Sequence, residues 1–507
     1  MRPVLTPEQA GSLDRESQAR GITADSLMER AGRHVARAAA TVAGGIYGRR
    51  AVVVCGKGNN GGDGLVAARA LAGIGMRVAV ILLGSPQELS GPAAANLARL
   101  DEVGLRPRAF EPDHLARELG RADVAVDALF GTGFRGAPEG EWAQAIAALN
   151  EGGRPVVAVD IPSGVNGATA AVEGEAVRAD LTVTFGAAKV GVILPPGTGF
   201  AGLVEVADIG FPPDLVRTDL WLMERADVAA LLPERGFETH KRSAGVAVVI
   251  GGSRLMTGAV CLSAEAAYRA GAGLVTVAVP EGILPVVQTR LRETTFIPLP
   301  ETGEGTVAAS IERLEQGLEA ADAVAIGPGM TTQEETAAYV RTLVRSCPVP
   351  VLVDADGLNA FAGRADELAD RRSPAVLTPH AGEFARLSGS SAAEVTADRV
   401  GRARALAGRT GATVLLKGSR TVVAEPGGPV RVNPTGGPFL ATGGTGDVLT
   451  GIITGFLAQG MEPADAAACG AYVHGLAGLR AASSRGDGMV AGDLLEPVAE
   501  VLEELRT

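Results

Sequence analysis

The sequence contains little cysteine, the residue that stabilises small secreted proteins through disulfides and that binds structural zinc. Only four cysteines occur in 507 residues, and no two of them form a CxxC pair. This spacing excludes a disulfide framework and a cysteine-ligated zinc site as the basis of the fold. We therefore expect buried structural thiols at Cys55, Cys261, Cys347 and Cys469.

Excess basic charge and long apolar runs are also missing. The formal net charge is −12, which argues against a nucleic-acid partner because phosphate backbones are bound by clustered Lys and Arg. A phosphorylated small molecule is not excluded, since backbone amides can bind phosphate without net positive charge. No stretch reaches the ~18 uninterrupted apolar residues of a membrane span, and residues 1–10 show no signal-peptide pattern. We expect a cytoplasmic protein without membrane contacts.

Glycine, by contrast, is abundant, with 69 residues. Short β-branched runs end repeatedly in glycine or an acidic residue and alternate with helical patterns, which predicts parallel sheets covered on both faces. A segment rich in proline and charge, residues 211–245, interrupts the alternation. Because 507 residues exceed one core, we predict an α/β protein of two domains, 1–215 and 220–507. Each is a mostly parallel sheet between helices, with ligands at the carboxyl ends of the strands.

The densest motif in the first half is GKGNNGGDG, Gly56 to Gly64, between an apolar run and a helical pattern. Its five glycines let the backbone turn sharply and approach a ligand closely. The helix N-terminus that follows suits a phosphate or diphosphate. The motif matches neither GxGxxG nor GxxxxGK[ST]. A turn that only caps the helix is the alternative, but the density of glycine favours a binding loop.

Two aspartates stand at the ends of later strands in the first half. Asp127 precedes a second glycine-rich loop, Gly131 to Gly136, and Asp160 precedes Ser163. An aspartate at the end of an apolar strand is costly unless it is paired, hydrated or bound to a cation. Asp127 alone is better explained as structural. Together with Asn60 and Ser163, however, it forms an oxygen-only set that could enclose a hard cation.

The segments GNNGGDGLVAAR, DALFGTG and DIPSG, in this order, resemble the NAD(P)H-hydrate epimerases over approximately residues 1–215. The resemblance implies a Rossmann-like domain that inverts C6 of hydrated NADH or NADPH between R and S. It implies a potassium ion held by Asn60, Asp127 and Ser163, and we assign general acid–base catalysis to Asp160. The hydrate-binding residues that it implies are Asn59, Asn60, Gly61, Gly62, Asp63, Gly131, Thr132, Gly133, Phe134, Arg135, Gly136, Ala137 and Asp160.

In the second half, ATGGTGDVLTG places Asp447 where a glycine-rich turn opens a helix. Such a turn can stabilise the charge of a transferring phosphoryl group while the carboxylate accepts a proton. An aspartate that only interacts with the helix dipole is the alternative. Further turns follow predicted strands: Gly251–Ala259, Gly327–Gly329, Val353–Asn359, Thr378–Phe384 with His380, and Leu415–Thr421, for which a plain hairpin is the alternative.

Together these motifs resemble the ADP/ATP-dependent NAD(P)H-hydrate dehydratases, of the ribokinase-like fold, over roughly residues 220–507. The resemblance implies that Asp447 deprotonates the 6-hydroxyl, which attacks the terminal phosphoryl of ADP; phosphate then leaves C6. A magnesium ion is expected with the nucleotide. Phe439 and Leu440 stand where related sequences carry small residues and Met, so this loop is expected to be slightly reshaped. The implied hydrate contacts are Ala259, Gly329, His380 and Asp447, and the implied nucleotide contacts are Lys417, Gly418, Ser419, Arg420, Thr421 and Gly446.

The whole chain thus resembles the bifunctional NAD(P)H-hydrate repair enzymes. The expected partners are small molecules, namely NADH and NADPH hydrates and ADP, and further copies of the chain in a homo-oligomer. Two alternatives remain open at this point. The second domain could be a kinase for a vitamin precursor or sugar alcohol, and the first could be a binding or scaffold module without catalysis.

Overall fold

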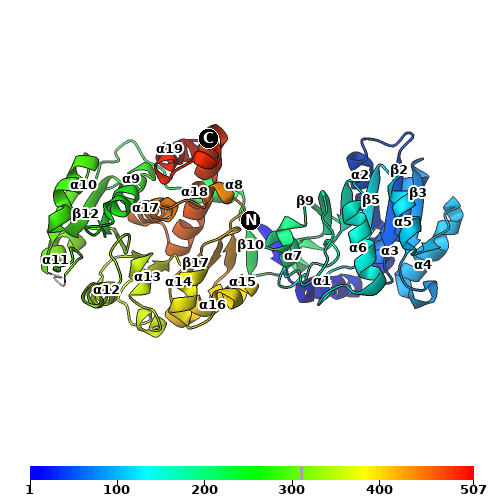
Figure 1. Cartoon of the computed structure of the whole chain (residues 1–507), viewed down its shortest axis with the longest axis horizontal. Coiled ribbons are helices and arrows are strands. Elements are labelled where there is room, and N and C mark those ends of the chain that lie inside the picture. The colour runs from blue at the N-terminus through cyan, green and yellow to red at the C-terminus, as the bar shows by residue number, and fades with distance from the viewer. Residues whose placement is uncertain (309–311) are drawn as a thin grey trace. The chain divides into compact units, whose positions relative to one another are not determined.

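The computed structural model describes residues 1–308 and 312–507. The chain divides into two compact units, Arg2–Thr218 and Asp219–Thr507. In Figure 1 the first unit runs from blue to green and the second from green to red. Each unit has its own sheet and its own apolar cores.

The first unit is built on a seven-stranded sheet in which every pairing is parallel. Two short strands, β1 (Arg2–Leu5) and β8 (Ala188–Lys189), pair beside it. The order reverses between β2 and β5, and ligands of such sheets bind at this switch point. The sheet strands, in spatial order, are β4 (Arg108–Ala109), β3 (Arg77–Leu82), β2 (Arg50–Cys55), β5 (Val124–Ala128), β6 (Val156–Val159), β7 (Leu181–Phe185) and β9 (Leu203–Ala207).

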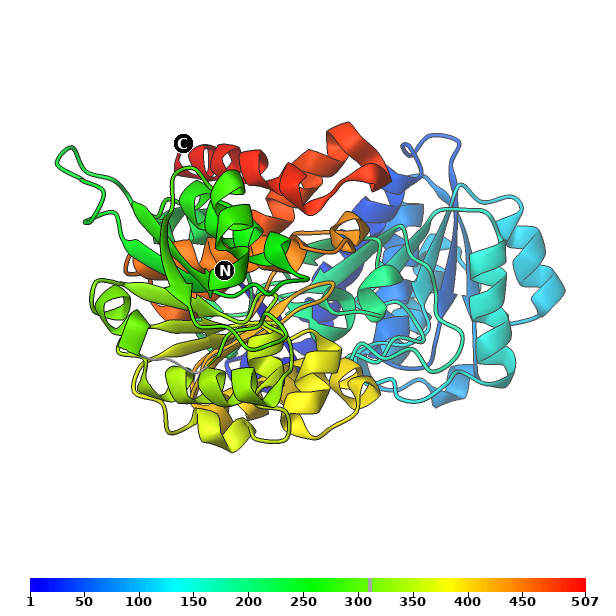
Figure 2. The ribbon, with the colours of Figure 1, turned by 60° about the vertical axis from the view of Figure 1, so that its left-hand side comes forward.

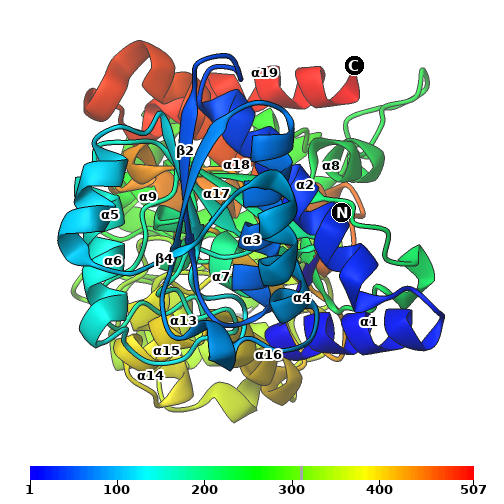
Figure 3. The ribbon, with the colours of Figure 1, turned by 90° about the vertical axis from the view of Figure 1, so that its right-hand side faces the viewer.

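Helices cover both faces of this sheet, as Figure 3 shows with α2–α4 on one side and α5 and α6 on the other. Because side chains alternate along a strand, Val53 packs into the core of α2 and α3 while Val52 and Val54 pack against α5 and α6. The helices are α1 (Pro7–Ala19), α2 (Ala24–Val42), α3 (Asn59–Gly73), α4 (Gly91–Arg99), α5 (Pro112–Leu119), α6 (Gly140–Glu151) and α7 (Val190–Ile193).

The second unit contains a larger sheet that is parallel except for β18, which is antiparallel to both of its neighbours. Its strands, in spatial order, are β13 (Thr295–Leu299), β12 (Leu274–Pro280), β11 (Val246–Ile250), β14 (Ala323–Ile326), β15 (Val351–Val353), β16 (Ala375–Leu377), β17 (Thr413–Leu416), β18 (Val422–Ala424), β19 (Val430–Val432) and β10 (Leu220–Leu222).

Helices flank this sheet on two sides. In Figure 2 the orange-to-red helices near the C-terminus and the yellow helices lie on opposite sides of the strands. Helices α9 and α17–α19 share one core with Val249, Ala325 and Leu352 of the sheet. The helices are α8 (Arg225–Leu231), α9 (Thr257–Arg269), α10 (Leu284–Arg290), α11 (Glu312–Glu319), α12 (Glu334–Ser346), α13 (Asp356–Asn359), α14 (Ala381–Ser388), α15 (Ala392–Ala397), α16 (Arg399–Thr410), α17 (Thr445–Ala458), α18 (Pro463–Arg485) and α19 (Leu495–Arg506).

The predicted fold class is confirmed, since each unit is a mostly parallel sheet between helices. The four cysteines are buried and unpaired, as expected. No helix among the described residues combines the length and apolarity needed to cross a membrane. One local difference concerns α3, which begins at Asn59, inside the glycine-rich motif rather than after it. A Cβ at Gly61 would lie 1.9 Å from the carbonyl oxygen of Gly56, so this glycine permits the close turn from β2 into α3.

Candidate active sites

A pocket of about 990 Å³ lies against the loops that follow β2, β5 and β6 in the first unit. Its size suits a ligand as large as a nucleotide. Arg135 does not line this pocket; its side chain donates to two nearby carbonyl oxygens, Thr132 O and Phe134 O. Gly61, Gly62, Arg135 and Gly136 are not among the lining residues. The predicted residues that line the pocket are Asn59, Asn60, Asp63, Gly131, Thr132, Gly133, Phe134, Ala137 and Asp160.

Asp160 is held in the pocket wall by an ion pair that the sequence did not predict. Lys189, whose side chain is only 3% exposed, places Nζ 2.6 Å from Asp160 Oδ1. The same ammonium donates to Thr184 Oγ1 at 3.1 Å and to Phe185 O at 2.7 Å. Asp160 also has a φ of 64°, a conformation that is costly for a residue with a side chain and is typical of functional sites. The surroundings therefore fix both the backbone and the carboxylate.

A second carboxyl group in the same wall is Asp63, the fifth residue of α3. Burial raises its pKa well above the usual value, and the negative charges of Asp160 and Asp14 raise it further. Lys189 acts in the opposite direction but does not outweigh these effects. Asp63 therefore keeps its proton at a pH where an exposed aspartate has lost it.

Of the three side chains predicted to bind potassium, Asn60 and Ser163 contact the main chain of Phe130, and Asp127 contacts Ser163. Asn60 Nδ2 donates to Phe130 O at 2.8 Å, and Phe130 N donates to Ser163 Oγ at 2.9 Å. Ser163 Oγ in turn donates to Asp127 Oδ1 at 2.6 Å. Asp127 is fully buried, and burial raises its pKa to about 6 against the hydrogen bonds from Ser163 and Leu129. A buried carboxylate with only neutral hydrogen-bond donors around it fits a site for a cation.

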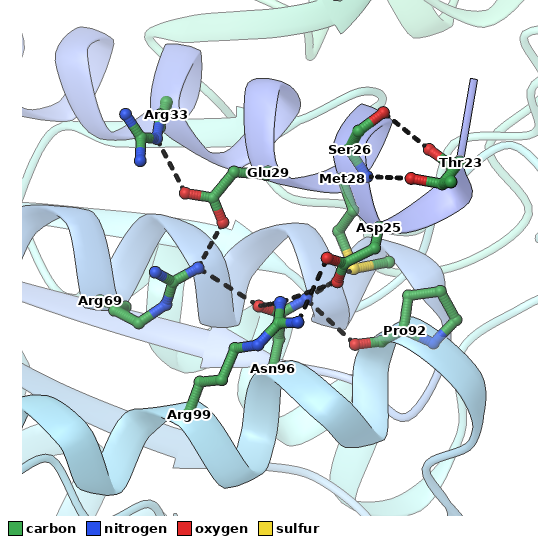
Figure 4. Close-up of polar contacts among 10 residues, drawn as sticks. All are labelled: Thr23, Asp25, Ser26, Met28, Glu29, Arg33, Arg69, Pro92, Asn96 and Arg99. Atoms are coloured by element: carbon green, nitrogen blue, oxygen red, sulfur yellow. Dashed lines mark hydrogen bonds and ion pairs between the residues drawn. The ribbon is translucent and has the colours of Figure 1, made fainter. Parts of the chain in front are cut away.

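Behind this pocket a polar network ties α2, α3 and α4 together (Figure 4). Its centre is Asn96, which is fully buried and whose Nδ2 donates to Pro92 O at 3.0 Å and to Met28 Sδ at 3.4 Å. Pro92 and Met28 both line the pocket. Asn96 Oδ1 accepts from Arg69 at 3.3 Å and from Arg99 at 3.4 Å. Through Asn96, the network therefore holds Met28 and Pro92 of the pocket wall in place.

In the second unit, Asp447 occupies the first turn of α17, close to a buried ion pair. Asp354, 2% exposed, pairs with Lys417 Nζ at 2.8 Å. Burial raises the pKa of Asp447 to about 7, and the charge of Asp354 contributes in the same direction. A Cβ at Gly446 would lie 3.6 Å from Lys417 Nζ, so the ammonium stands beside the start of α17. Asp447 and Lys417 thus form a partly buried carboxyl–ammonium site at a helix N-terminus.

Asp354 itself is held as a carboxylate. Burial would raise its pKa, but the charge of Lys417 and hydrogen bonds from Lys417, Thr450 and Thr378 outweigh burial and keep the pKa below its usual value. Thr378 Oγ1 donates at 2.8 Å and Thr450 Oγ1 at 2.7 Å. The ion pair also reaches Glu383, whose Oε2 lies 3.8 Å from Lys417 Nζ.

The other hydrate contacts predicted for the second unit are His380, Ala259 of α9, and Gly329 after β14. His380 caps α14, accepting at Nδ1 from Gly382 N at 3.0 Å, and its side chain is 54% exposed. Ala259 and Gly329 face each other, because a Cβ at Gly329 would lie 3.4 Å from Ala259 Cβ. Phe439 and Leu440 pack against Gly478 of α18, which shows how this loop accommodates the larger residues.

The loop from Lys417 to Thr421 is the turn between β17 and β18, so the hairpin alternative describes its geometry correctly. Arg399, at the start of α16, donates to the carbonyl groups of Ser419 and of Leu416, the latter at 3.1 Å. Arg420 has a φ of 56° and donates to Pro434 O at 3.0 Å. Gly418, with a φ of 145°, adopts a conformation that favours glycine. The loop is therefore fixed in shape on both sides of the hairpin.

Sequence reasoning missed the two lysine–aspartate pairs of the sites. Lys189 stands in the stretch TFGAAKVG, which has no motif of its own, and its signal is only that a lysine follows an apolar strand. Asp354 lies in the predicted turn Val353–Asn359, whose sequence does not indicate a lysine partner. Both residues acquire a role through partners far along the chain, 29 positions away for Lys189 and 63 for Asp354.

Comparison with known proteins covers both units. Residues 24–191 match the family model described as the YjeF-related protein N-terminus, and residues 247–499 match the model described as NAD(P)H-hydrate dehydratase. The chain is 43% identical to the bifunctional NAD(P)H-hydrate repair enzyme Nnr of Moorella thermoacetica, over 99% of this chain and 97% of that protein. The Nnr of Thermofilum pendens is 42% identical, over 97% of this chain and 95% of that protein.

Among solved structures, the second unit is similar to an ADP/ATP-dependent NAD(P)H-hydrate dehydratase from Bacillus subtilis, co-crystallised with ATP and Mg²⁺. The two are 31% identical, with a TM-score of 0.50. The alignment covers 57% of this chain and 100% of the other.

Proposed function

The chain belongs to the bifunctional NAD(P)H-hydrate repair enzymes, and from this premise we propose how its two sites divide the repair. The first unit epimerises the R and S forms of NADH or NADPH hydrate at C6. The second unit dehydrates the S form to NAD(P)H at the expense of ADP, which yields AMP and phosphate. The observation that carries the proposal is that each unit places a candidate aspartate beside a lysine. Asp160 lines the first pocket and pairs with the buried Lys189, and Asp447 stands near the partly buried Lys417 at the start of α17.

In the first unit, the proposed role of Asp160 is proton transfer at the C6 hydroxyl. The hydroxyl lies next to the ring nitrogen, so acid–base assistance can open this centre and allow it to close with the opposite configuration. Lys189 and Thr184 hold one carboxylate oxygen of Asp160. The glycine-rich loops on either side bring the main chain close to the hydrate and exclude water from it.

A potassium ion in the first unit is part of this proposal. Asn60, Asp127 and Ser163 would hold it, because they supply oxygen ligands around a buried carboxylate that lacks a cationic partner among its hydrogen bonds. Oxygen donors of this kind suit hard cations. The ion would supply positive charge near Phe130 and the loop Gly131–Gly136, where a phosphate of the hydrate can bind.

In the second unit, the proposed role of Asp447 is to accept the proton of the 6-hydroxyl as that oxygen attacks the terminal phosphoryl of ADP. Phosphorylation converts a poor leaving group into a good one, and the lone pair of the ring nitrogen then drives loss of phosphate from C6. Loss of a proton from C5 to solvent leaves its electron pair as the C5–C6 double bond and returns the lone pair to nitrogen. Lys417 and the amides at the start of α17 stabilise the transferring charge. Mg²⁺ would arrive with the nucleotide phosphates, whose oxygens it prefers.

The hydrate contacts proposed for this site are Ala259, Gly329, His380 and Asp447, and Lys417 to Thr421 with Gly446 would hold the nucleotide. ADP rather than ATP, a cytoplasmic location and a homo-oligomer stay predictions. A kinase for another small molecule is not favoured, because the full-length relatives carry hydrate repair in their names.

The test is to incubate the full chain with mixed R and S NADH hydrate and ADP, and to follow NADH absorbance together with both epimers by chromatography. We expect both epimers to be converted to NADH. Asp447→Asn should abolish NADH formation and leave epimerisation intact, because the two sites lie in different units. ADP-dependent NADH formation at the wild-type rate by Asp447→Asn would remove Asp447 from the mechanism.

A further inference from the structure

The charged groups that line the first pocket are unevenly distributed. They are Asp14 from α1, Lys57 and Asp63 around the start of α3, Glu139 before α6, Asp160 after β6, and Lys189 of β8. Lys57 pairs with Glu88 at 2.8 Å, and the residues of α2 that line the pocket carry no charge. The pocket therefore contains more carboxyl groups than the single acid–base residue of the proposed epimerisation requires.

Asp160 and Asp63 differ in how they are held. Asp160 Oδ1 accepts hydrogen bonds from Lys189 Nζ at 2.6 Å, Thr184 Oγ1 at 2.9 Å and Phe185 N at 3.2 Å. These donors hold Oδ1 in place. Asp160 Oδ2 takes part in no hydrogen bond among the described residues. One oxygen thus anchors the group, and the other is left for the ligand.

Asp63 has the opposite surroundings. It lies on a different element, α3, and no ion pair or side-chain hydrogen bond to it is found in the described part of the chain. Burial raises the pKa of Asp63. The carboxyls of Asp160 and Asp14, which line the same pocket, raise it further because another negative charge beside them is unfavourable. One carboxyl of the pair is therefore suited to accept a proton and the other to donate one.

We propose that Asp63 is the second catalytic residue of epimerisation and acts as the acid opposite Asp160, which Lys189 fixes as the base. This inference rests on the proposed epimerase function and adds the chemical route. Asp63 gives its proton to the 6-hydroxyl as the C6–O bond breaks, and the oxygen leaves with the electron pair as water. The lone pair of the ring nitrogen forms a double bond to C6.

Water then adds to C6 from the opposite face. The electron pair of the nitrogen–carbon double bond returns to nitrogen, and the extra proton of the added water goes to Asp160 Oδ2. Asp63 ends without its proton and Asp160 with one, which is the arrangement needed to convert the other epimer in the reverse direction. Lys189 is a positioning residue in this scheme, because its ammonium is already used by three acceptors.

The experiment uses the full chain with one purified epimer of NADH hydrate, without ADP, in ¹⁸O-labelled water. Chromatography with mass detection follows inversion and oxygen content from pH 6 to 9, against a blank without enzyme. We expect each inversion to introduce one solvent oxygen at C6. We expect Asp63→Asn to slow inversion at least ~100-fold, Asp63→Glu to retain part of the rate, and the exposed-surface control Asp101→Asn to behave as the wild type.

The outcomes separate the inference from the function on which it rests. Inversion by Asp63→Asn at the wild-type rate, or a product that keeps its original oxygen, overturns the two-carboxyl route while epimerisation itself stands. If the wild-type chain does not invert the hydrate at all, the proposed function fails first. Should Asp63→Asn fail to fold, the oxygen content of the wild-type and Asp63→Glu products still decides the question.

Discussion

At the scale of single residues, the second unit shows how two carboxyls in one place acquire different tasks. Asp354 is paired with Lys417 and bonded by two threonines, which outweighs its burial and keeps its pKa low. No side-chain hydrogen bond or ion pair of Asp447 is found in the described part of the chain, and its pKa rises to about 7 through burial and the charge of Asp354. Environments that separate the pKa values of neighbouring carboxyls assign the acid–base roles. Asp354 thus holds Lys417, which agrees with the proton transfer that we propose for Asp447.

A pH dependence of dehydration follows from this difference. As a base, Asp447 must be deprotonated, so kcat/KM should increase about tenfold per pH unit below about pH 7 and level off above it. The measurement is ADP-dependent NADH formation from the S hydrate between pH 5 and 9. A rate that is flat across neutrality would show that another group accepts the proton. Asp101→Asn, in the other unit, is the control and should keep the wild-type profile.

The buried carboxyl of Asp127 gives a prediction about potassium. If Asn60, Asp127 and Ser163 hold the ion, adding KCl should raise the epimerisation rate several-fold more than LiCl at equal ionic strength. Asp127→Ala should remove this response, because it deletes the only charged ligand of the set. Epimerisation that is indifferent to potassium in the wild-type chain would contradict a catalytic cation at this position.

The sequence predicted the residues that stand at strand ends and missed those that complete the sites from elsewhere. Asp127 and Asp160 could be found because the carboxyl ends of parallel strands meet at one edge of the sheet. Lys189 could not, because its role depends on β8 lying beside the loop after β6, a tertiary contact with no local pattern. Asp63 was predicted only as a hydrate contact, since its protonation depends on the surrounding charges.

At the scale of elements, both sites are built at the start of a helix rich in glycine. The sequence predicted helices after both motifs but did not show how closely they pack. A Cβ at Gly451 of α17 would lie 2.1 Å from Ser263 O of α9. A Cβ at Gly64 of α3 would lie 2.5 Å from Ala128 Cβ at the end of β5. These glycines let α17 pack closely against α9 and α3 against β5, and this packing positions the first turn of each helix at its proposed site.

The network around Asn96 predicts how α4 supports the pocket. Asn96→Leu should destabilise the first unit by ~1–3 kcal/mol, since Arg69 and the Pro92 carbonyl lose a buried partner. It should also raise KM for epimerisation, because Met28 and Pro92 line the pocket, and leave dehydration unchanged. Thermal unfolding and the two activities measure this. Arg33→Met, at the exposed end of the same network, is the control and should cost under ~1 kcal/mol.

At the scale of the whole molecule, the two activities depend on each other through the substrate. A dehydratase that accepts only the S epimer can recover only that part of a hydrate pool unless the R epimer is converted. Fusing an epimerase to it removes this limit, and the site that we propose for each unit is made of residues of that unit alone. The epimer released by one unit can therefore be used by the second unit of any copy of the chain.

Asp160→Ala tests this division of labour. With ADP present, this variant should consume the S hydrate at the wild-type rate, while the R hydrate persists and decays only at the slow rate of spontaneous inversion. Asp447→Asn should interconvert both epimers and form no NADH. An equimolar mixture of the two variants should restore complete conversion, because the hydrate diffuses between them. If R and S disappear from the Asp160→Ala reaction at wild-type rates, Asp160 is not the acid–base residue of the first unit. If the mixture fails to convert the R epimer, the hydrate must pass between units of the same chain rather than through solution.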